Sequence, residues 1–282
     1  MTLSISPLSD ALGAEVRGID WRAGPSQDEL AVIRKAFLDY HLLCLRSEPL
    51  DSEGFAKAAS YFGSPQKQLL RAKRDGDVSE VSILDSTYAT AADKPDDMRQ
   101  VRLSGWHTDD SFQPLPAKAT ALQALVIPDS GGETRFANTR RAYEDLTDEL
   151  RDQIDGLSTV HSYDTQRASA PAETLTATEK NDTTDVEHPL ARTHEDTGRK
   201  AIYFNPNRTD RIVGMDRESS DALLDIIDAH VKQLKYQYHH SWRVGDILVW
   251  DNRCLLHSVN MDFPVGQTRR HQRILLSGSK PV

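Results

Sequence analysis

A histidine and an aspartate two positions apart, His107 and Asp109, are the residues of this sequence best suited to chemistry. In a β-strand the side chains of residues i and i+2 leave the same face, so both could reach one metal ion. His257, in an apolar segment, is the best candidate for a third ligand. Two imidazoles and one carboxylate on one face of an octahedral ion form the facial triad of non-haem Fe(II) oxygenases, which leaves coordination positions open. The pair alone is not specific, because short motifs match by chance.

A hydroxyl and two guanidinium groups further along the chain could receive carboxylates. Thr134 follows the turn at residues 128–132, and Arg269 and Arg273 stand four positions apart close to the last predicted strand. A planar guanidinium presents a fork of N–H donors that matches a carboxylate bidentately. These residues therefore predict a site for small anions.

Length and composition indicate an ordinary globular protein. The 282 residues are 38% hydrophobic and 27% charged, and no apolar run approaches the length of a membrane span, so we expect no membrane role. The amino-terminal stretch lacks the basic and apolar regions of a secretory signal, which predicts a cytoplasmic location. A net charge of -9 opposes nucleic-acid binding by the surface as a whole. A small anionic substrate remains compatible with the local arginines, and a homo-oligomer stays open.

Short apolar stretches and amphipathic segments must position these side chains. The predicted strands cover residues 12–20, 41–45, 78–84, 119–127, 133–137, 200–204, 247–250 and 273–277. The predicted helices cover residues 27–40 with Ser26 as N-cap, 52–62 ending at Gly63, 139–154 closed by Gly156, and 219–234. Many short strands, few helices and no βαβ alternation favour a mostly β protein, a sandwich or barrel with peripheral helices.

Two cysteines and one polar segment complete the expectations for the fold. Cys44 and Cys254 lie in apolar, strand-like stretches and are expected to be buried, reduced thiols, although one bridge stays open. Residues 164–187 contain almost no large apolar side chain and cannot contribute a core. Such an insertion is usually a functional lid or a disordered segment, and we favour a lid within a single domain of residues 1–282.

Several motifs occur together in an order that resembles the taurine and 2,4-dichlorophenoxyacetate dioxygenase family of Fe(II)/2-oxoglutarate enzymes. The motifs are Trp106-His107-Thr108-Asp109, Gly131-Gly132-Glu133-Thr134, His188-Pro189-Leu190, residues 197–205, Trp250-Asp251-Asn252-Arg253 with His257, and Arg269 with Arg273. The resemblance extends from about Leu12 to the end of the chain. Together the motifs are far more specific than any one of them.

This resemblance implies a metal, a co-substrate and a fold. It makes His107, Asp109 and His257 the ligands of Fe(II), with 2-oxoglutarate and O2 as co-substrates. It also implies a double-stranded β-helix, or jelly-roll, core, which agrees with the predicted strands. The expected reaction is hydroxylation of a substrate with succinate and CO2 as co-products. Because the carboxylate Asp109 is present, we expect hydroxylation rather than halogenation.

The resemblance also assigns roles to the candidate anion-binding residues. Thr134 and Arg269 would bind the distal carboxylate of 2-oxoglutarate, and Arg273 would pair with the anionic group of the primary substrate. Residues 66–71 and 102–105 differ from the corresponding stretches of taurine-type enzymes, whereas residues 111–114 and 254–257 look closer to those of phenoxyacetate-type enzymes. Leu69, Leu70 and Leu103 could line an apolar pocket. We expect a small organic carboxylate, aryloxyalkanoate-like.

Other functions remain open at this point. The same chemistry could act on an alkyl sulfonate, a sulfate ester or an amino-acid-derived metabolite. If hydroxylation falls beside an ether oxygen, a sulfonate or a sulfate ester, the product would fragment. A zinc hydrolase could use the same ligand set, but it has no use for a co-substrate pocket. A non-catalytic binding module is the third class.

The remaining polar and aromatic residues of interest are expected to be structural. Asp110 is interpreted as a carboxylate that supports the site or lies at the surface, and not as a ligand. The others are His161, His188 and His194 in structural or surface roles, Arg253 and Arg270 as ion-pair partners or solvated side chains, Trp250 in the core, and Lys67, Arg71, Lys73 and Arg74 in a solvated loop.

Overall fold

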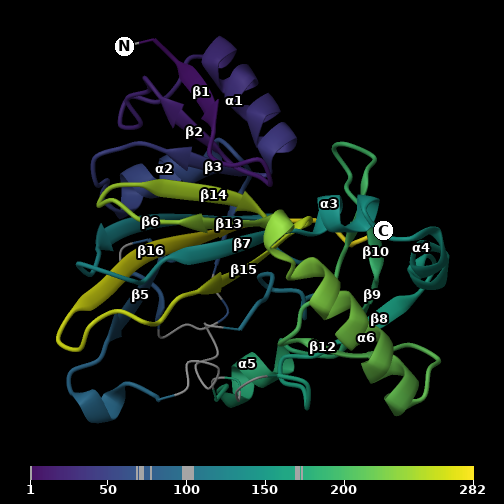
Figure 1. The fold of residues 1–282 in the computed structure, drawn as a ribbon. Coiled ribbons are helices and arrows are strands. Elements are labelled where there is room, and N and C mark those ends of the chain that lie inside the picture. Colours follow the sequence, from purple (N-terminus) through teal and green to yellow (C-terminus); the bar gives the residue numbers. More distant parts are fainter. Residues whose placement is uncertain are drawn as a thin grey trace.

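The structure is a computed structural model that describes residues 2–67, 69, 73–76, 78–96, 105–168, 172 and 174–282. It is mostly β with helices at the periphery, as the sequence predicts (Figure 1). The larger sheet has the order β1-β2-β3-β14-β6-β16-β4, and β5 also pairs with β16. Its strands are β1 (Ser4–Pro7), β2 (Ala14–Arg17), β3 (Leu42–Leu45), β4 (Pro65–Gln66), β5 (Ser82–Thr87), β6 (Ala119–Val126), β14 (Ile247–Asp251) and β16 (Thr268–Leu276).

A second, three-stranded antiparallel sheet faces the larger one. It consists of β13 (Gln237–His240), β7 (Thr134–Asn138) and β15 (Leu255–Val259), in the order β13-β7-β15. Phe136 and Leu255 from this sheet share a buried apolar cluster with Leu248 and Trp250 of β14. The space between the two sheets is therefore a packed core.

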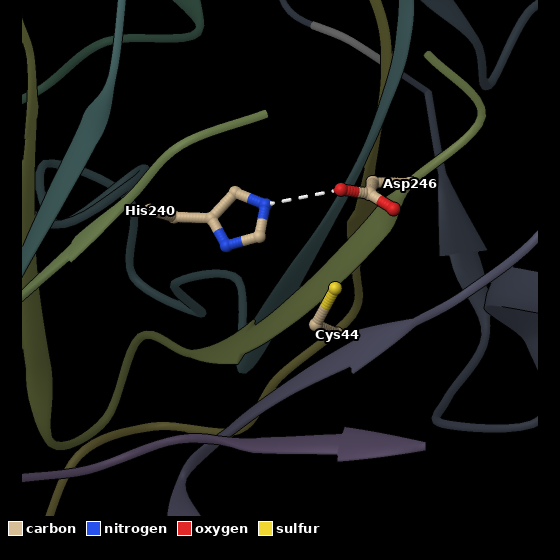
Figure 2. A group of neighbouring side chains, drawn as sticks. All are labelled: Cys44, His240 and Asp246. Atoms are coloured by element: carbon tan, nitrogen blue, oxygen red, sulfur yellow. Dashed lines mark ion pairs between the residues drawn. The ribbon is translucent and has the colours of Figure 1, made fainter. Parts of the chain in front are cut away.

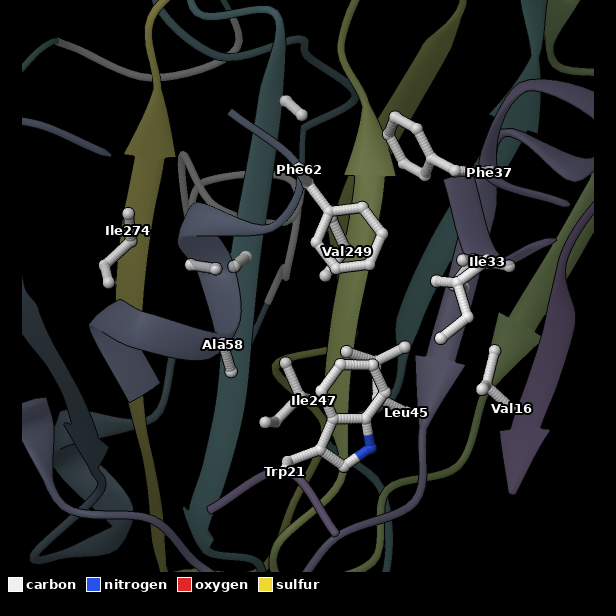
Figure 3. Close-up of a cluster of buried hydrophobic side chains, with 14 of the residues drawn as sticks. Val16, Trp21, Ile33, Phe37, Leu45, Ala58, Phe62, Ile247, Val249 and Ile274 are labelled. Carbon is white, nitrogen blue, oxygen red and sulfur yellow. The ribbon is translucent and has the colours of Figure 1, made fainter. Parts of the chain in front are cut away.

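The other face of the larger sheet is covered by two helices, α1 (Gln27–Tyr40) and α2 (Ser52–Ser60). Ile33 and Phe37 of α1 pack on Leu45, Ile247 and Val249 (Figure 3). Alternate side chains of β3 and β14 thus enter the helix-covered layer and the layer between the sheets. Burial on both faces explains why these strands are continuous apolar runs in the sequence.

A third layer covers the outer face of the small sheet. Its strands are β8 (Ser158–His161), β9 (Val186–Pro189), β10 (Ala191–Thr193), β11 (Lys200–Ile202) and β12 (Thr209–Ile212). Its helices are α3 (Thr139–Glu144), α4 (Asp148–Ile154), α5 (Ala177–Asn181) and α6 (Arg217–Val231). The described residues also include the short 3-10 helices η2 (Ala91–Asp93) and η5 (Leu234–Tyr236). Leu223 and Ile227 of α6 pack with Ile202 and Ala142 in one apolar cluster. No helix in the described part of the chain is long and apolar enough to cross a membrane.

Helix α1 confirms the prediction for residues 27–40. The Ser26 side chain accepts a hydrogen bond from the Glu29 backbone N–H, and the Glu29 carboxylate accepts from the Ser26 backbone N–H, which forms a capping box. The helix ends at His41, whose left-handed backbone has φ 63°. This end turns the chain directly into β3.

Several predicted boundaries are wrong, among them the helix expected at residues 219–234, which is α6 at Arg217–Val231. Helix α2 ends with Tyr61 as C-cap in a right-handed conformation, and Gly63 is not left-handed. The single helix expected at residues 139–154 is divided into α3 and α4, because the Thr147 side chain caps a new amino terminus by accepting from the Leu150 N–H. The strand expected at residues 78–84 lies at β5, and the last strand, β16, begins five residues earlier than residue 273, at Thr268.

Candidate metal centre and anion pocket

Strand β15 and the segment before β6 bring two imidazoles together. The His107 backbone N–H donates to the His257 carbonyl at 2.9 Å, and the His257 N–H donates to the His107 carbonyl at 2.7 Å. Residues that exchange both bonds in this way lie directly opposite each other. The two ring centroids are accordingly only 4.1 Å apart. A two-residue backbone bridge therefore fixes the spacing of the candidate ligands.

Asp109 joins the pair from a turn and not from a strand. The expectation that His107 and Asp109 share one strand face is wrong, because only His107 makes a β-bridge and the chain turns at Asp109. The carboxylate still reaches the imidazoles, with Oδ2 at 3.8 Å from His257 Nε2. Donor atoms of His107, Asp109 and His257 all lie within 4.8 Å of one another. The structure thus brings together the three residues that the sequence singles out.

A chain of hydrogen bonds from the core fixes the Asp109 carboxylate. The Thr120 hydroxyl of β6 donates to Asp109 Oδ2 at 2.6 Å and accepts from Asn252 Nδ2 at 2.9 Å. Asn252 Oδ1 in turn accepts from the Trp250 indole N–H at 3.0 Å. Thr120 and Asn252 were not singled out as site residues, because their spacing to Asp109 carries no motif. Supporting hydrogen bonds of this kind orient metal ligands in proteins.

The electrostatics of the three side chains suit a divalent metal ion. Burial lowers the pKa of His107 and lowers that of His257 to about 3, which favours the neutral form in which an imidazole binds a metal ion. The Gly105 carbonyl lies 2.8 Å from His107 Nδ1 and accepts its hydrogen bond, so Nε2 is the ring atom that can bind a metal ion. Burial opposes ionisation of Asp109, yet His257, Arg273 and His107 hold its pKa below the ordinary value. Two neutral imidazoles and one carboxylate form the donor set that Fe(II) accepts.

Arg269 and Thr134 form a second, buried polar pair. Arg269 Nη2 donates to Thr134 Oγ1 at 3.1 Å, and Arg269 Nε donates to the Gly132 carbonyl at 2.9 Å. Gly132 has a left-handed backbone (φ 72°), which brings its carbonyl within reach of Arg269. A Cβ at this position would lie 3.4 Å from Arg269 Cδ. Burial lowers the pKa of Arg269 to about 10, and no carboxylate pairs with it among the described residues. A buried guanidinium without an acidic partner is a receptor for an anion.

Arg273 lies on the same face of β16 as Arg269 and next to the candidate ligands. Its Nη1 is 3.6 Å from Asp109 Oδ1, and about a quarter of its side chain is exposed. Asp110, the other carboxylate of the turn, accepts from Gln66 Nε2 at 3.0 Å. Burial and the neighbouring Asp109 raise the pKa of Asp110 to about 6. The site therefore combines three candidate metal ligands with a buried guanidinium, that of Arg269, and a partly exposed one, that of Arg273.

Two further groups of potential metal donors do not fit a metal. Cys44, His240 and Asp246 lie together in the core, with His240 Nε2 3.4 Å from Asp246 Oδ2 (Figure 2). Asp246 is already paired with Arg46 at 2.5 Å, and burial raises the pKa of the Cys44 thiol to about 12. In the other group, His194, Asp251 and Cys254, Arg253 holds the carboxylate at 2.7 Å. Both cysteines are free and buried, as predicted.

The residues interpreted as structural have structural partners. His161 Nε2 lies 2.9 Å from Thr159 Oγ1, His188 Nε2 lies 3.1 Å from the Gln113 carbonyl, and His194 Nε2 lies 2.9 Å from Asp251. Arg253 pairs with Asp251 and Asp196, Arg270 lies 3.8 Å from Asp85, and Trp250 is buried. Arg71, Leu70 and Leu103 lie outside the described residues, so the predicted apolar lining is untested.

Comparison with known proteins matches almost the whole chain to one family. The family described as "Taurine catabolism dioxygenase TauD, TfdA family" matches residues 4–275. The chain belongs to this family. It is 29% identical over 266 residues to an alpha-ketoglutarate-dependent 2,4-dichlorophenoxyacetate dioxygenase from Cupriavidus pinatubonensis, covering 91% of this chain and 92% of that protein. It is 30% identical over 284 residues to an alkylsulfatase from Acinetobacter baylyi, covering 98% and 85%.

Solved structures of TauD/TfdA-type enzymes share the fold of this family member. A putative alpha-ketoglutarate-dependent taurine dioxygenase from Burkholderia xenovorans superposes with a TM-score of 0.84 at 28% identity, covering 100% of this chain and 94% of that one. AAD-2, in complex with Mn(II) and N-oxalylglycine, superposes with a TM-score of 0.81 at 27% identity, covering 100% and 99%. The TauD/TfdA protein described here is thus a 2-oxoglutarate-dependent dioxygenase that uses Fe(II) and O2. The zinc-hydrolase and binding-module hypotheses have no support.

Proposed function

We propose that this dioxygenase hydroxylates a small organic carboxylate, aryloxyalkanoate-like, with succinate and CO2 as co-products. The observation that carries the proposal is the position of Arg273, whose guanidinium lies 3.6 Å from Asp109 in the candidate metal group. A carboxylate paired with Arg273 would be anchored beside the metal, with its neighbouring carbon presented to it. The name of the 2,4-dichlorophenoxyacetate dioxygenase relative is consistent with such a substrate.

In this proposal His107, Asp109 and His257 hold Fe(II), which supplies the oxygen chemistry when bound. The backbone bridge between His107 and His257 sets the spacing of the imidazoles. Thr120 orients the carboxylate by donating to one of its oxygens. Because their donor atoms already lie within 4.8 Å of one another, the three side chains need little rearrangement to receive the ion.

Thr134 and Arg269 would bind the distal carboxylate of 2-oxoglutarate. The Arg269 guanidinium is positioned by the Gly132 carbonyl and by Thr134, and its low exposure excludes water from the bond it would make. A charge-assisted bond in such a place is stronger than one in water. The pocket thus selects a co-substrate that carries a carboxylate at the end remote from the metal.

A second candidate class is an alkyl sulfonate or a sulfate ester. Arg273 would pair with a sulfate as well as with a carboxylate, because both present oxygens to its planar fork. The alkylsulfatase relative and a sulfate ester dioxygenase from Pseudomonas putida, 30% identical over 295 residues, favour this class. Hydroxylation of the carbon beside the ester oxygen would then release sulfate and an aldehyde.

We also infer that the two facing sheets form the double-stranded β-helix, or jelly roll, of a single domain. Supporting this, β14, β6 and β16 pack across the core from β7 and β15, and the candidate ligands lie at one end between them. Residues 164–187 would act as a lid. Helix α5 lies within that segment, is capped by Thr176, and buries Glu179.

An anaerobic titration of metal-free protein with Fe(II) and 2-oxoglutarate tests the proposal. A visible charge-transfer band in the parent protein, absent in His257→Ala, is the expected result. Aerobic screening of phenoxyacetates, alkyl sulfates and alkyl sulfonates for succinate release would then identify the substrate class. Folded parent protein without a band would overturn the ligand assignment, whereas a band with no stimulation by any carboxylate would overturn the substrate.

A further inference from the structure

A buried asparagine joins the turn that carries Asp109 to the loop before β12. The Asn205 side-chain amide donates to the Thr108 carbonyl at 2.7 Å and to Ser111 Oγ at 2.9 Å. The Asn205 carbonyl accepts from the Arg208 backbone N–H at 2.9 Å. Asn205 is almost fully buried, so these bonds are shielded from water. The backbone of Arg208 is thereby fixed relative to the candidate metal group.

Two aromatic rings hold the Arg208 side chain. The guanidinium carbon lies 5.0 Å from the ring centroid of Phe112 and 4.3 Å from that of Tyr163. The two rings themselves meet edge to face, with centroids 5.2 Å apart and an interplanar angle of 88°. Stacking uses the faces of a guanidinium, while its N–H donors lie in its plane, where an oxyanion accepts them. The rings therefore restrict the direction in which Arg208 donates.

Arg208 and Arg273 both lie against the turn that carries Asp109. Arg273 Nη1 is 3.6 Å from Asp109 Oδ1. Phe112, which contacts Arg208, belongs to the same turn as both aspartates. Two guanidinium groups thus lie beside the turn that carries Asp109 and Asp110.

We propose that Arg208 is a specificity-determining residue that binds a second anionic group of the primary substrate, which is therefore a small organic dianion. This inference rests on the proposed function and deepens it, because Arg273 would hold one oxyanion and Arg208 the other. A dianion would make a charge-assisted contact with each guanidinium, whereas a monoanion would make only one. Charge complementarity across both groups would discriminate dianions from monoanions that are otherwise alike.

The experiment compares phenoxyacetate with its para-carboxy derivative, which adds one carboxylate to the same ring. Calorimetric titration of each compound into the anaerobic Fe(II)/2-oxoglutarate enzyme gives a dissociation constant without turnover. The variants are Arg208→Gln and the charge-conserving Arg208→Lys. Arg211→Gln is the matched control, because Arg211 lies three residues further on, in β12, and makes an exposed ion pair with Asp210 at 2.7 Å.

We expect the parent to bind the dicarboxylate tighter than phenoxyacetate, and Arg208→Gln to weaken the dicarboxylate roughly ten- to a hundredfold while changing phenoxyacetate less than about threefold. Arg208→Lys should recover part of the preference, and Arg211→Gln should retain all of it. Equal effects of Arg208→Gln on both compounds, or loss of the charge-transfer band in that variant, would overturn the inference. Phenoxyacetate binding with no preference for the dicarboxylate would overturn it too and leave the proposed function standing. Failure of both compounds to bind an enzyme that shows the band would overturn the substrate class together with this inference.

Discussion

At the scale of single residues, the candidate site consists of side chains that are costly to bury unless they have a ligand or partner. Arg269 is buried without an acidic partner among the described residues, and His257 and Asp109 face each other at 3.8 Å. Hydrogen bonds within the protein offset part of the desolvation of these groups, and a bound ion or anion would offset more of it. The site is therefore organised for ligands before they arrive.

The sequence allowed the candidate ligands of this site to be grouped, but it did not predict their geometry. His107, Asp109 and His257 could be grouped because a family motif and one distant histidine suffice to name them. The cross-strand bridge of His107 with His257 could not be predicted, because it joins segments 150 residues apart in register. Thr120 was missed for the same reason, since its bond to Asp109 depends on how β6 passes the turn.

Replacement of Thr120 by valine should weaken metal binding without removing a ligand. Valine conserves the shape of the side chain but cannot donate to Asp109 Oδ2 or accept from Asn252. Loss of a supporting hydrogen bond of this kind lowers metal affinity about ten- to a hundredfold. An anaerobic Fe(II) titration measures the change, and Thr87→Val, which removes an exposed hydroxyl contact with Thr268, is the control. An unchanged affinity would show that Thr120 does not orient the carboxylate.

Replacement of Arg269 by alanine should raise the concentration of 2-oxoglutarate required for half-maximal succinate formation. The change removes a buried charge-assisted contact, which is worth about 1.5–3 kcal/mol, or roughly ten- to a hundredfold in affinity. Arg270→Gln is the matched control, because Arg270 is the next residue in the same strand. Its side chain is about half exposed, and its Nε makes a weak ion pair with Asp85 at 3.8 Å. A weaker affinity for the primary substrate, with 2-oxoglutarate binding unchanged, would contradict the assignment of the two arginines.

At the scale of elements, predictions from the sequence succeeded where local signals agree with tertiary burial. Strands β3, β6 and β14 and helix α1 were found because each is a continuous apolar or periodic stretch with clear ends. Strands β8 and β13 were missed because histidines and other polar residues interrupt any apolar run in them. Their pairing comes from neighbours distant in sequence, which no local pattern reports.

The capping box of α1 should make a measurable contribution to stability. Ser26→Ala removes the oxygen that accepts from the Glu29 N–H and the hydroxyl that donates to the Glu29 carboxylate. We expect the free energy of unfolding to fall by about 1 kcal/mol, as for other N-cap residues. Denaturant unfolding measures this loss, and Ser26→Asp, which can still cap, should retain most of the stability. Equal losses in both variants would attribute the effect to something other than the cap.

At the scale of the whole molecule, the core contains several histidines that are kept neutral by burial. Among those outside the candidate metal group are His41, His161, His188 and His271. Desolvation lowers the pKa of His41 and of His188 to about 4, and it lowers the pKa values of His161 and His271 well below the ordinary range. The unfolded chain binds protons at these residues near pH 6.5, and the folded protein does not. Stability should therefore be retained above pH 6.5 and fall progressively as the pH is lowered towards 4.

His271 offers a direct test of this proton linkage. Neither of its ring nitrogens has a hydrogen-bond partner among the described residues, and the ring packs edge to face on Trp242 at 4.6 Å. His271→Leu should therefore cost little stability at pH 7.5, where the imidazole is neutral in both states. Below pH 6.5 each histidine that stays neutral in the folded protein lowers the free energy of unfolding by up to about 1.4 kcal/mol per pH unit. Because the variant lacks one such histidine, its free energy of unfolding should fall less steeply with decreasing pH, by up to that amount. Denaturant unfolding of metal-free parent and variant between pH 7.5 and 4.5 measures the two slopes, and the other titrating groups cancel in their difference. Parallel curves for the two proteins would mean that His271 binds its proton in the folded state, and the burial of this side chain would then not control the acid stability of the molecule.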